Sequence, residues 1–562
     1  MSQFYDQASL VMVPSGYKAG KVYSQKPLST DGELTFTRNS NATRIGPDGK
    51  LERVRTNELV YSQDFTQTAW TNNSTATLSS TTTVTPAGTT DAVRVTSTAA
   101  TQDLRQIRTI TSGLPYTNSA YIRRVSGTGT VRIIEVNGST LGITPTSEWQ
   151  RFSITSTATS TTGRFYIRLD TSGDSIEVWG CQMEISDFGP TDYIATTSAA
   201  VSVGPTANVP RLDYTPTLGQ SGGDGCPSLL LEPQRTNLAL YSEQLDNAAW
   251  TKSGVTVTAN QAISPDGYQN ADKVTNATVS DFISQIIAGP TATAYAASFY
   301  IKNEDSTLTE ILVRNSVSSL FGEINWSGSQ LVSITGVVNG TLTFEAVGND
   351  WYRIFAYYTS VETIQRVRIF PDKIASGKSV YVWGYQLEQG ASYASSYIGP
   401  TLGASVTRLA DAAYKTGISS LIGQTEGTIY AEIDFDTISE ESRFIQLSDG
   451  TNNNRFYIGA LTTNNINYTA ITAGTTIVNI SSSAQSSGVL KVAAAYANND
   501  FVLYVNGTQI GTDTTGTIPA MSQVSVGYNN LANNRHIAYG VNQALLFKTR
   551  LTNAQLAELT TL

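Results

Sequence analysis

Residues 55–71 read RTNELVYSQDFTQTAWT, and residues 235–251 read RTNLALYSEQLDNAAWT. Eight of these 17 positions are identical. The match continues in the same order through further pairs of segments: 116–123 with 295–302, 149–152 with 351–354, 178–184 with 382–388, and 193–194 with 397–398. This order predicts two copies of one fold. The offset grows from 180 to 204 residues, so we expect longer surface loops in the second copy.

The residues between these matched segments are typical of short β-strands joined by polar turns. Charged residues are only 14% of the chain and hydrophobic residues 40%, which suits strands rich in β-branched and aromatic side chains. Asn137-Gly138 predicts a tight hairpin in the first copy, because both central residues of such a turn need positive φ. Each copy spans roughly 150 residues, the size of a β-sandwich. We therefore predict an all-β protein with tandem antiparallel β-sandwich domains.

The last 150 or so residues contain no copy of the repeat and form a third predicted domain. Residues 428–435 and 455–458 have clear strand patterns. Residues 501–505 lead through Asn506-Gly507 into residues 508–510, which predicts a hairpin. Thr552 and Gln555 have the spacing of a capping box and predict one short terminal helix.

A chain of 562 residues is too long for a single hydrophobic core. A Gly- and Pro-containing stretch at residues 218–227 reads as a loop between the two copies. We expect five segments: an N-terminal leader at 1–54, a sandwich at 55–200, a linker at 201–234, a second sandwich at 235–405, and a C-terminal domain at 406–562.

Two stretches carry a resemblance to known proteins. They are GCPSLLLEPQRTNLALYSEQLDNAAWT at 225–251, preceded by RLDY at 211–214, and YVWGYQLEQGASYASSYI at 381–398. They resemble a module of phage and prophage fibre or virion proteins, which is similar to jelly-roll carbohydrate-binding modules. The pattern KVAAAYANNDFVLYVNGTQIGTDT at 491–514 resembles a concanavalin A-like or laminin-G-like lectin sandwich.

The resemblance implies a non-enzymatic virion structural protein, in a head or tail fibre or spike, that displays glycan-binding modules for attachment to a host cell-surface glycan. It also implies a homo-oligomer, a trimer, in which many weak sites act together. Residues 1–54 resemble the leader of such proteins and would contact other virion proteins. A purely architectural decoration protein is an alternative.

The N-terminal residues Met1 to Asp6 do not have the pattern of a signal peptide, and no apolar run is long enough to cross a membrane. We therefore expect assembly in the host cytoplasm and location in the virion. The net charge is −9 and no basic run is present, so a nucleic-acid groove is not expected.

The sequence has only two cysteines and one histidine, which leaves few residues for disulfide bonds, metal binding or nucleophilic catalysis. Cys181 lies in a strand-like run and is expected to be a small buried hydrophobic residue, and one further cysteine, Cys226, cannot make a disulfide-rich scaffold. A zinc site lacks ligands. A Ser-His-Asp site would need His536, the only histidine, which lies in the polar loop 533–536 without a nucleophile motif nearby.

The seven tryptophans include the candidate glycan contacts, because a flat ring can cover the apolar face of a sugar. Trp179 and Trp383 lie within apolar VWG strands and are expected in the core. Trp70 and Trp250 can be core residues or contacts. Trp326 is unpaired across the repeat and lies beside a turn, so it is the best single candidate for an exposed contact specific to the second copy.

No cofactor is expected, although the resemblance to carbohydrate-binding modules implies a structural calcium ion in oxygen-rich loops. The candidate ligands are Asp64, Asp91 and Asp272, with Glu184 and Glu388 as further acidic residues. No calcium-loop motif of the DxDxDG kind is present.

The enzyme alternative rests on Glu432, Asp434 and Asp436, which alternate along one predicted strand and share a face. They resemble the carboxylates of concanavalin A-like glycoside hydrolases, in which Glu432 would be the nucleophile. That family has a Glu as acid/base where this sequence has the shorter Asp436. We favour the other interpretation, a half-exposed strand with residues 429, 431, 433 and 435 inside.

Overall fold

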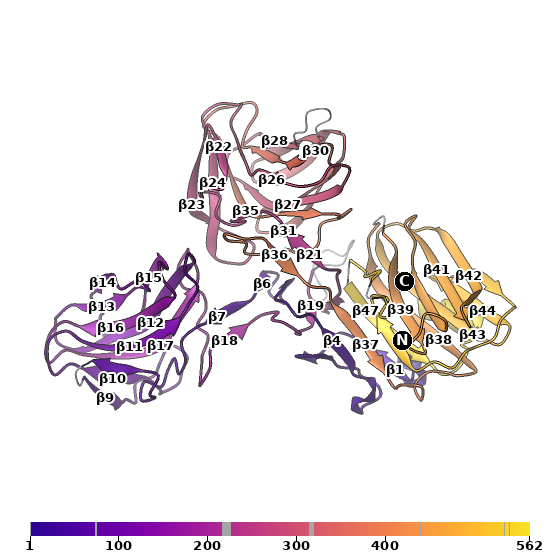
Figure 1. Ribbon diagram of the computed structural model, residues 1–562, viewed down its shortest axis with the longest axis horizontal. Coiled ribbons are helices and arrows are strands. Elements are labelled where there is room, and N and C mark those ends of the chain that lie inside the picture. The colour runs from indigo at the N-terminus through magenta and orange to yellow at the C-terminus, as the bar shows by residue number, and fades with distance from the viewer. Residues whose placement is uncertain are drawn as a thin grey trace. The chain divides into compact units, whose positions relative to one another are not determined.

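The protein forms two compact units in a computed structural model (Figure 1). It describes residues 2–73, 76–215, 226–313, 320–437, 440–532, 534–538 and 540–561. One unit comprises residues 54–204, and the other comprises residues 1–53 together with residues 205–562. Both are built from antiparallel strands, which confirms the predicted all-β class.

The unit 54–204 is the first sandwich. One sheet has the order β15 (Gln150–Thr157), β12 (Pro115–Ser126), β17 (Ser175–Ile185), β10 (Val93–Thr96), β9 (Thr77–Ser80). The other has the order β14 (Thr140–Ile143), β13 (Val131–Ile134), β16 (Thr162–Leu169), β11 (Gln102–Thr109), β8 (Thr71–Asn73). The entering strand β7 (Arg55–Asn57) pairs with β18 (Val201–Val203), so the sandwich closes just beyond the predicted boundary at residue 200.

The second sandwich repeats this arrangement with one extra strand in each sheet. One sheet has the order β22 (Thr251–Ser253), β25 (Phe282–Ser284), β34 (Val367–Phe370), β28 (Leu308–Val313), β29 (Leu320–Ser327), β30 (Gln330–Val338). The other has the order β23 (Val255–Ile263), β24 (Gln269–Asn276), β35 (Ser379–Gln389), β27 (Ala294–Asn303), β32 (Trp351–Thr359), β31 (Thr341–Gly348). The added residues of the second copy thus form the edge strands β30 and β31 rather than only loops.

Two short pairs complete the second sandwich, and a third lies in the N-terminal segment. They are β21 (Arg235–Asn237) with β36 (Val406–Arg408), β26 (Ile287–Ala288) with β33 (Ile364–Gln365), and β5 (Thr43–Ile45) with β6 (Leu51–Arg53). The pair β21–β36 is the counterpart of β7–β18, because the Asn residue of each entering strand donates to two carbonyls of its own sandwich. The repeat therefore also includes the short strand pair that joins the first and last segments of each sandwich.

The C-terminal sandwich consists of two larger sheets. Eight strands form one: β19 (Arg211–Asp213), β20 (Ser228–Leu230), β47 (Gly540–Phe547), β38 (Glu426–Phe435), β43 (Gly488–Ala497), β44 (Asp500–Val505), β45 (Thr508–Asp513), and β1 (Leu10–Met12) on β47. Nine form the other: β2 (Tyr17–Lys18), β3 (Lys21–Val22), β4 (Leu34–Thr37), β37 (Ala412–Thr416), β46 (Gln523–Val526), β39 (Ser442–Ser448), β40 (Arg455–Ala460), β41 (Asn465–Thr472), β42 (Thr475–Ala484).

Three short helices complete this sandwich: α1 (Ser2–Gln7), η1 (Thr30–Gly32) and α2 (Asn553–Thr560). The Thr552–Gln555 capping box at the start of α2 is present as predicted. Asn506 and Gly507 both have positive φ between β44 and β45, which confirms the predicted hairpin.

The sequence predicted a separate N-terminal leader and a separate linker at 201–234. In the structure, β1 to β4 of the leader and β19–β20 of the linker are instead strands of the C-terminal sandwich. Leu10, Phe36 and Leu229 are buried in one core cluster with the strands of residues 412–547. Burial of these apolar side chains stabilises the sandwich, and the partner strands are too distant in sequence for local patterns to indicate the pairing. Residues 216–225, which include most of the predicted loop 218–227, lie outside the described residues.

A buried ionic cluster ties together four segments of the larger unit. Arg38 lies 2.9 Å from Asp411, Arg211 lies 2.7 Å from Glu232, and Arg408 lies 2.7 Å from Glu232. Arg211 also contacts Asp411, and all five side chains are at most 2% exposed. Burial alone would raise the pKa of Glu232, but Arg408 and Arg211 lower it to about 2. These charges therefore compensate one another inside the unit.

Candidate ligand-binding cavity

Trp70 and Trp250 are core residues at equivalent places in the two sandwiches. They are 5% and 3% exposed. Their indole nitrogens donate to the carbonyl oxygens of Tyr61, at 2.9 Å, and Tyr241, at 3.0 Å. Because both faces are packed in the core, neither ring presents a surface to a sugar. Trp179 and Trp383, 3% and 0% exposed, are in the core as predicted.

Trp326 is also buried, so the prediction that it is exposed is wrong. It is 8% exposed, and its Nε1 donates to the Thr309 hydroxyl at 2.9 Å. Along β29 the buried residues alternate, and Trp326 falls in register with the buried Leu320 and Ile324. The strand continues up to the turn, and its alternation directs this ring inward.

The candidate calcium ligands are not brought together. Asp64 and Asp91 belong to the first sandwich and Asp272 to the second. Asp64 accepts hydrogen bonds from Thr66 and Gln67, Asp91 from Thr89 and Trp179, and Asp272 from two backbone N–H groups. Glu184 and Glu388 each accept a hydrogen bond from a glutamine two residues earlier. Among the described residues no group of three or more His, Cys, Asp or Glu side chains could hold a metal.

The acidic strand β38 is half-exposed, with Ile429, Ala431, Ile433 and Phe435 buried as expected. The carboxylate of Glu432 accepts from the Tyr430 hydroxyl at 3.2 Å and from the Gln543 amide at 3.1 Å. Asp434 accepts from Asn542 at 2.8 Å, and Asp436 from Ser487 at 2.6 Å. Each of the three acids thus has a neighbouring side-chain donor.

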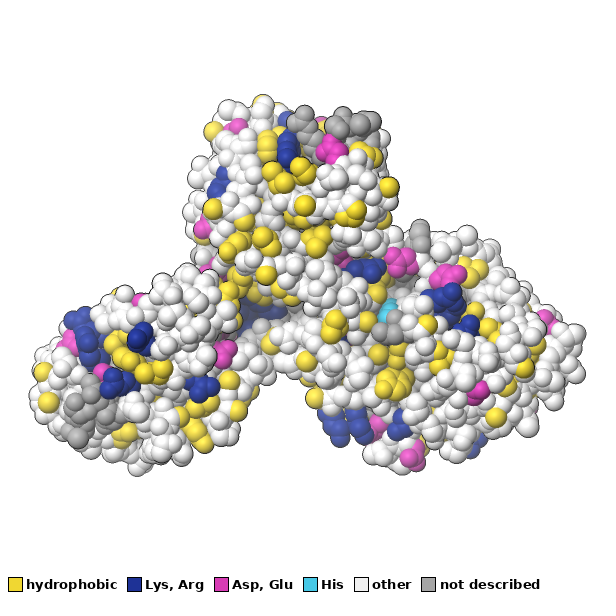
Figure 2. Space-filling model, in the orientation of Figure 1, with side chains coloured by type: hydrophobic (Ala, Val, Ile, Leu, Met, Phe, Trp, Pro, Cys, Tyr) yellow, Lys and Arg dark blue, Asp and Glu magenta, His cyan; other side chains and the backbone are white. Residues whose placement is uncertain are grey.

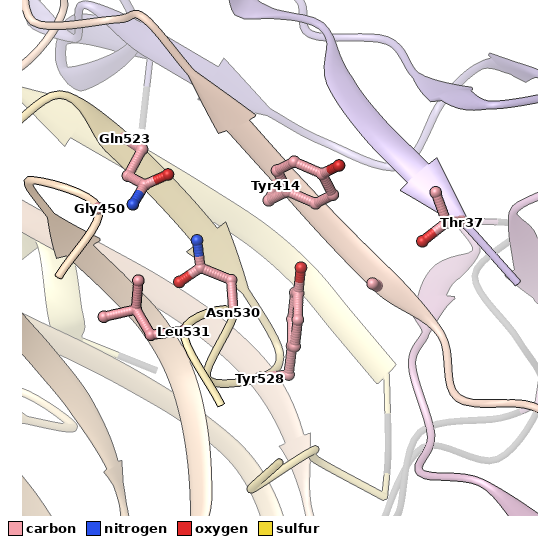
Figure 3. A pocket seen from close by; sticks show the side chains of 8 residues that line it. Thr37, Tyr414, Gly450, Gln523, Tyr528, Asn530 and Leu531 are labelled. Carbon is pink, nitrogen blue, oxygen red and sulfur yellow. The ribbon is translucent and has the colours of Figure 1, made fainter. Parts of the chain in front are cut away.

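A different site stands out on the nine-stranded sheet, on the face opposite the core. A cavity of about 600 Å³ is lined by Thr37, Ala412, Tyr414, Gly450, Gln523, Tyr528, Asn530 and Leu531 (Figure 3). Tyr414 pairs with Ser525 on the adjacent strand β46, while the flanking Ala413 and Val526 enter the core. Strand alternation therefore fixes Tyr414 and Ser525 on the outer face.

The turn after β46 folds back over this outer face and forms one wall of the cavity. The Ser525 hydroxyl donates to the Tyr528 carbonyl at 3.0 Å. Gln446, 1% exposed, donates through Nε2 to the side-chain oxygens of Asn529, at 3.3 Å, and Asn530, at 3.1 Å. These bonds hold the amide of Asn530 at the cavity wall.

The Gln523 side chain, at the start of β46, also lines the cavity. Its Nε2 donates to the Ser448 hydroxyl at 3.0 Å, which orients the amide. In Figure 3 the amides of Gln523 and Asn530 lie next to each other. Two oriented amides offer both donors and acceptors to a ligand.

The aromatic part of the cavity consists of Tyr414 and Tyr528. In Figure 3 the hydroxyl end of Tyr528 is directed toward Tyr414. Burial raises the pKa of Tyr528, and the nearby Tyr414 adds to that effect, so Tyr528 stays a neutral donor and acceptor. Behind it, the His536 ring stacks on Tyr528 with 5.3 Å between centroids and 18° between planes.

No local pattern in the sequence indicates this cavity. Its lining comes from β4, β37, β46 and two turns, which are separated by up to about 490 residues along the chain. The polar loop 533–536 is evident in the sequence, but no local pattern indicates that Tyr528 lines a cavity. His536 is 7% exposed and packs behind the cavity. Cys181, fully buried as predicted, is not part of it.

No protein-family model matches this chain, and no curated protein is significantly similar to it. Solved structures with a similar arrangement include a family 40 carbohydrate-binding module of a Ruminococcus gnavus sialidase, bound to α2,3-sialyllactose. It is 16% identical and covers 26% of this chain and 91% of its own, with a TM-score of 0.23. A tandem of family 22 carbohydrate-binding modules from Paenibacillus barcinonensis Xyn10C is 11% identical. It covers 62% of this chain and 98% of its own, with a TM-score of 0.21.

A heptameric pentraxin of Limulus polyphemus is a third similar structure, with 14% identity over 24% of this chain and 68% of its own, and a TM-score of 0.19. Likenesses this low do not indicate a ligand, so the ligand must be argued from the cavity itself. No helix in the described part of the chain has the length and apolar character needed to span a membrane.

Proposed function

We propose that this chain is a non-enzymatic glycan-binding protein of a phage particle, part of a head or tail fibre or spike, which attaches the particle to a host cell-surface glycan. The observation that carries the binding part of this proposal is the cavity lined by Tyr414, Tyr528, Gln523 and Asn530. The virion part is supported by the resemblance of the sequence repeat to modules of fibre proteins.

The cavity suits a neutral sugar ring because it combines two kinds of contact. The C–H face of a sugar is apolar and packs against the ring of Tyr414. The hydroxyl groups of a sugar both donate and accept hydrogen bonds, as do the amides of Gln523 and Asn530. A volume of about 600 Å³ is enough for a disaccharide-sized ligand and lies in the usual range of small-molecule sites.

Attachment to a cell surface does not require a tight single site. We propose that the chain forms a homotrimer and that many copies on a particle act together, so that weak binding at each cavity suffices. We assign contacts with other virion proteins to the N-terminal residues, of which β2 is the edge strand of the nine-stranded sheet.

The test is a screen of the full-length chain against host surface polysaccharides, with binding and release of reducing ends measured on the same samples. We expect binding without products. Tyr414→Ala should weaken binding of the selected glycan at least tenfold, because it removes the ring on which a sugar packs. Tyr414→Phe, which keeps the ring, should retain most of the affinity.

A matched control is Trp326→Phe, which changes an aromatic residue that is buried in the second sandwich of the same unit. It should bind as the wild type does. Equal binding by wild type and Tyr414→Ala, or release of reducing ends by the wild type, would refute the proposal.

A further inference from the structure

One sheet face of the first sandwich gathers four arginines around a tyrosine. Along β16 the residues Arg164, Tyr166 and Arg168 alternate with the buried Phe165, Ile167 and Leu169, so they share the outer face. In the register of the sheet, Arg105 of β11 is the partner of Tyr166, and Arg132 of β13 is the partner of Arg168. Three strands therefore place these side chains side by side.

Acidic side chains neutralise only part of this charge. Asp170 lies 2.6 Å from Arg132 and 3.0 Å from Arg168, in each case at Nε. Asp103 lies 3.4 Å from Arg105. Four guanidinium groups thus face two carboxylates. Because Asp170 holds Nε, it orients both guanidinium groups and leaves Nη donors for another anion.

Arg164 is the cation of this face without a carboxylate partner among the described residues. Its Nη1 contacts only the Asn137 carbonyl, at 3.4 Å. Its neighbour across the ladder is Ile107, which is 55% exposed. A guanidinium without a carboxylate partner beside an exposed apolar side chain can contact both the carboxylate and the apolar ring face of a sugar acid.

The centre of the face is a cation–aromatic pair. The Arg105 guanidinium lies over the Tyr166 ring, 5.4 Å from its centroid, and both residues are half-exposed. Figure 2 shows dark blue Lys and Arg side chains around a yellow hydrophobic group on the visible face of this unit. All ten cationic residues of positions 54–204 are arginine and none is lysine. Arginine matches the planar carboxylate with two parallel hydrogen bonds, which lysine cannot do.

The second sandwich provides an internal comparison, because its register aligns residue by residue with the first. Arg366 is the counterpart of Arg164. The other three positions differ in the second sandwich, which has Arg368 in place of Tyr166, Phe370 in place of Arg168, and Glu310 in place of Arg132. Arg105 corresponds to Ser284. Arg368 is only 8% exposed, packed 4.4 Å from the centre of the Phe282 ring. The exposed arginine set is thus a property of the first sandwich.

We propose that this face, formed by Arg105, Arg132, Arg164, Tyr166 and Arg168, binds a carboxylate-bearing polysaccharide. The guanidinium groups would hold the sugar carboxylates, and Tyr166 with Ile107 would pack against the apolar ring faces. A nucleic acid fits less well. The unit has twelve acidic residues against its ten arginines, so the positive field is confined to this face. The site is separate from the cavity near Tyr414 and does not depend on it.

The experiment measures binding of the full-length chain to polygalacturonate and polyglucuronate, each beside its carboxyl-reduced, neutral form, and to single-stranded DNA. We expect binding to at least one acidic polymer, at least tenfold weaker binding to its neutral form, and weaker binding with rising salt. The double variant Arg105→Ser/Arg164→Gln should lose at least tenfold in affinity for the acidic polymer. Serine was chosen at position 105 because the second sandwich has Ser284 at the equivalent position.

The matched control is Arg366→Gln, the counterpart of Arg164 in the second sandwich, which should bind as the wild type does. Near-UV circular dichroism checks that the double variant remains folded, and the single variant Arg164→Gln, at a surface position, gives a second measurement if it does not. Binding unchanged in both variants, equal binding of the neutral polymer, tighter binding of DNA, or no binding of either acidic polymer would overturn the proposal. Tyr414→Ala should leave this binding unchanged, so failure here is distinct from failure at the cavity.

Discussion

The ring of His536 lies parallel to the ring of Tyr528, 5.3 Å away, and forms the back of the cavity in the C-terminal sandwich. Burial lowers the pKa of His536 to about 4; Asp411 opposes this, and Arg235 and Arg408 contribute to it. The imidazole is therefore neutral in the folded protein at pH 7 and becomes charged in the fold only below about pH 4, whereas the unfolded chain takes up this proton near pH 6.5.

This histidine makes stability depend on pH. Its folded pKa lies below its unfolded value of 6.5, so the unfolded chain takes up the proton first as the pH falls. The contribution of His536 to the free energy of unfolding should be constant above pH 6.5 and should decrease by roughly 3 kcal/mol between pH 6.5 and 4. Urea unfolding of the full chain at several pH values measures the slope.

The variant His536→Phe keeps the stacked ring and removes the titrating group. It should flatten the dependence between pH 6.5 and 4, while the acid loss near the low pKa of Glu232 remains. An unchanged slope in this variant would contradict the assignment.

Trp326 is expected to act on stability and not directly on ligand binding. Trp326→Ala should lower the free energy of unfolding by about 3–5 kcal/mol, because it leaves a cavity in the core and removes the donor to Thr309. The control Val332→Ala, at a side chain 62% exposed on the neighbouring strand, should cost less than about 1 kcal/mol. Denaturant unfolding compares the two, and similar small losses would show that the indole is not packed as described.

Glu52 and Glu232 each lie three residues before the first residue of a copy of the repeat, but they differ in environment. Glu232 is buried between Arg211 and Arg408, whereas Glu52 is 36% exposed beside Arg44. Glu232→Gln should destabilise the larger unit by about 3–5 kcal/mol, because it removes the carboxylate that contacts the buried Arg408 and leaves Arg211 with Asp411 as its acidic contact. Glu52→Gln should cost less than about 1 kcal/mol. Thermal unfolding distinguishes them, and equal losses would speak against a buried cluster.

Glu432→Gln tests the glycoside hydrolase alternative. We expect neither the wild type nor this variant to release reducing ends from host polysaccharides. The expected effect on stability is small, about 1 kcal/mol, from the altered hydrogen bonds to Tyr430 and Gln543. Product that forms with the wild type and disappears with the variant would establish the enzyme instead.

Some errors in the sequence-based predictions had a local signal that could have prevented them. Trp326 lies two residues after Ile324 and six after Leu320, so strand alternation by itself indicates an inward ring. The turn residues Ser327-Gly328 instead favour an exposed loop, but β29 extends to Ser327. The predicted half-exposed strand at Glu432 used the same rule correctly.

Other features had no local signal at all. Strand β1 pairs with β47 across more than 500 residues, and β4 pairs with β37 across nearly 380. The residues of the cavity and of the ionic cluster come from segments equally far apart. Neither the leader nor the linker could be recognised as part of the C-terminal sandwich from its own composition.

The sequence by itself determined the repeat, the all-β class, the Asn506-Gly507 hairpin and the cap at Thr552, because turn chemistry, capping and side-chain alternation act over a few neighbouring residues. Only the tertiary structure decided which strands close the C-terminal sandwich and which side chains meet at Tyr414 or around Tyr166. Those contacts depend on the register of long-range strand pairs, and a slip of one residue would turn every side chain of a strand to the other face.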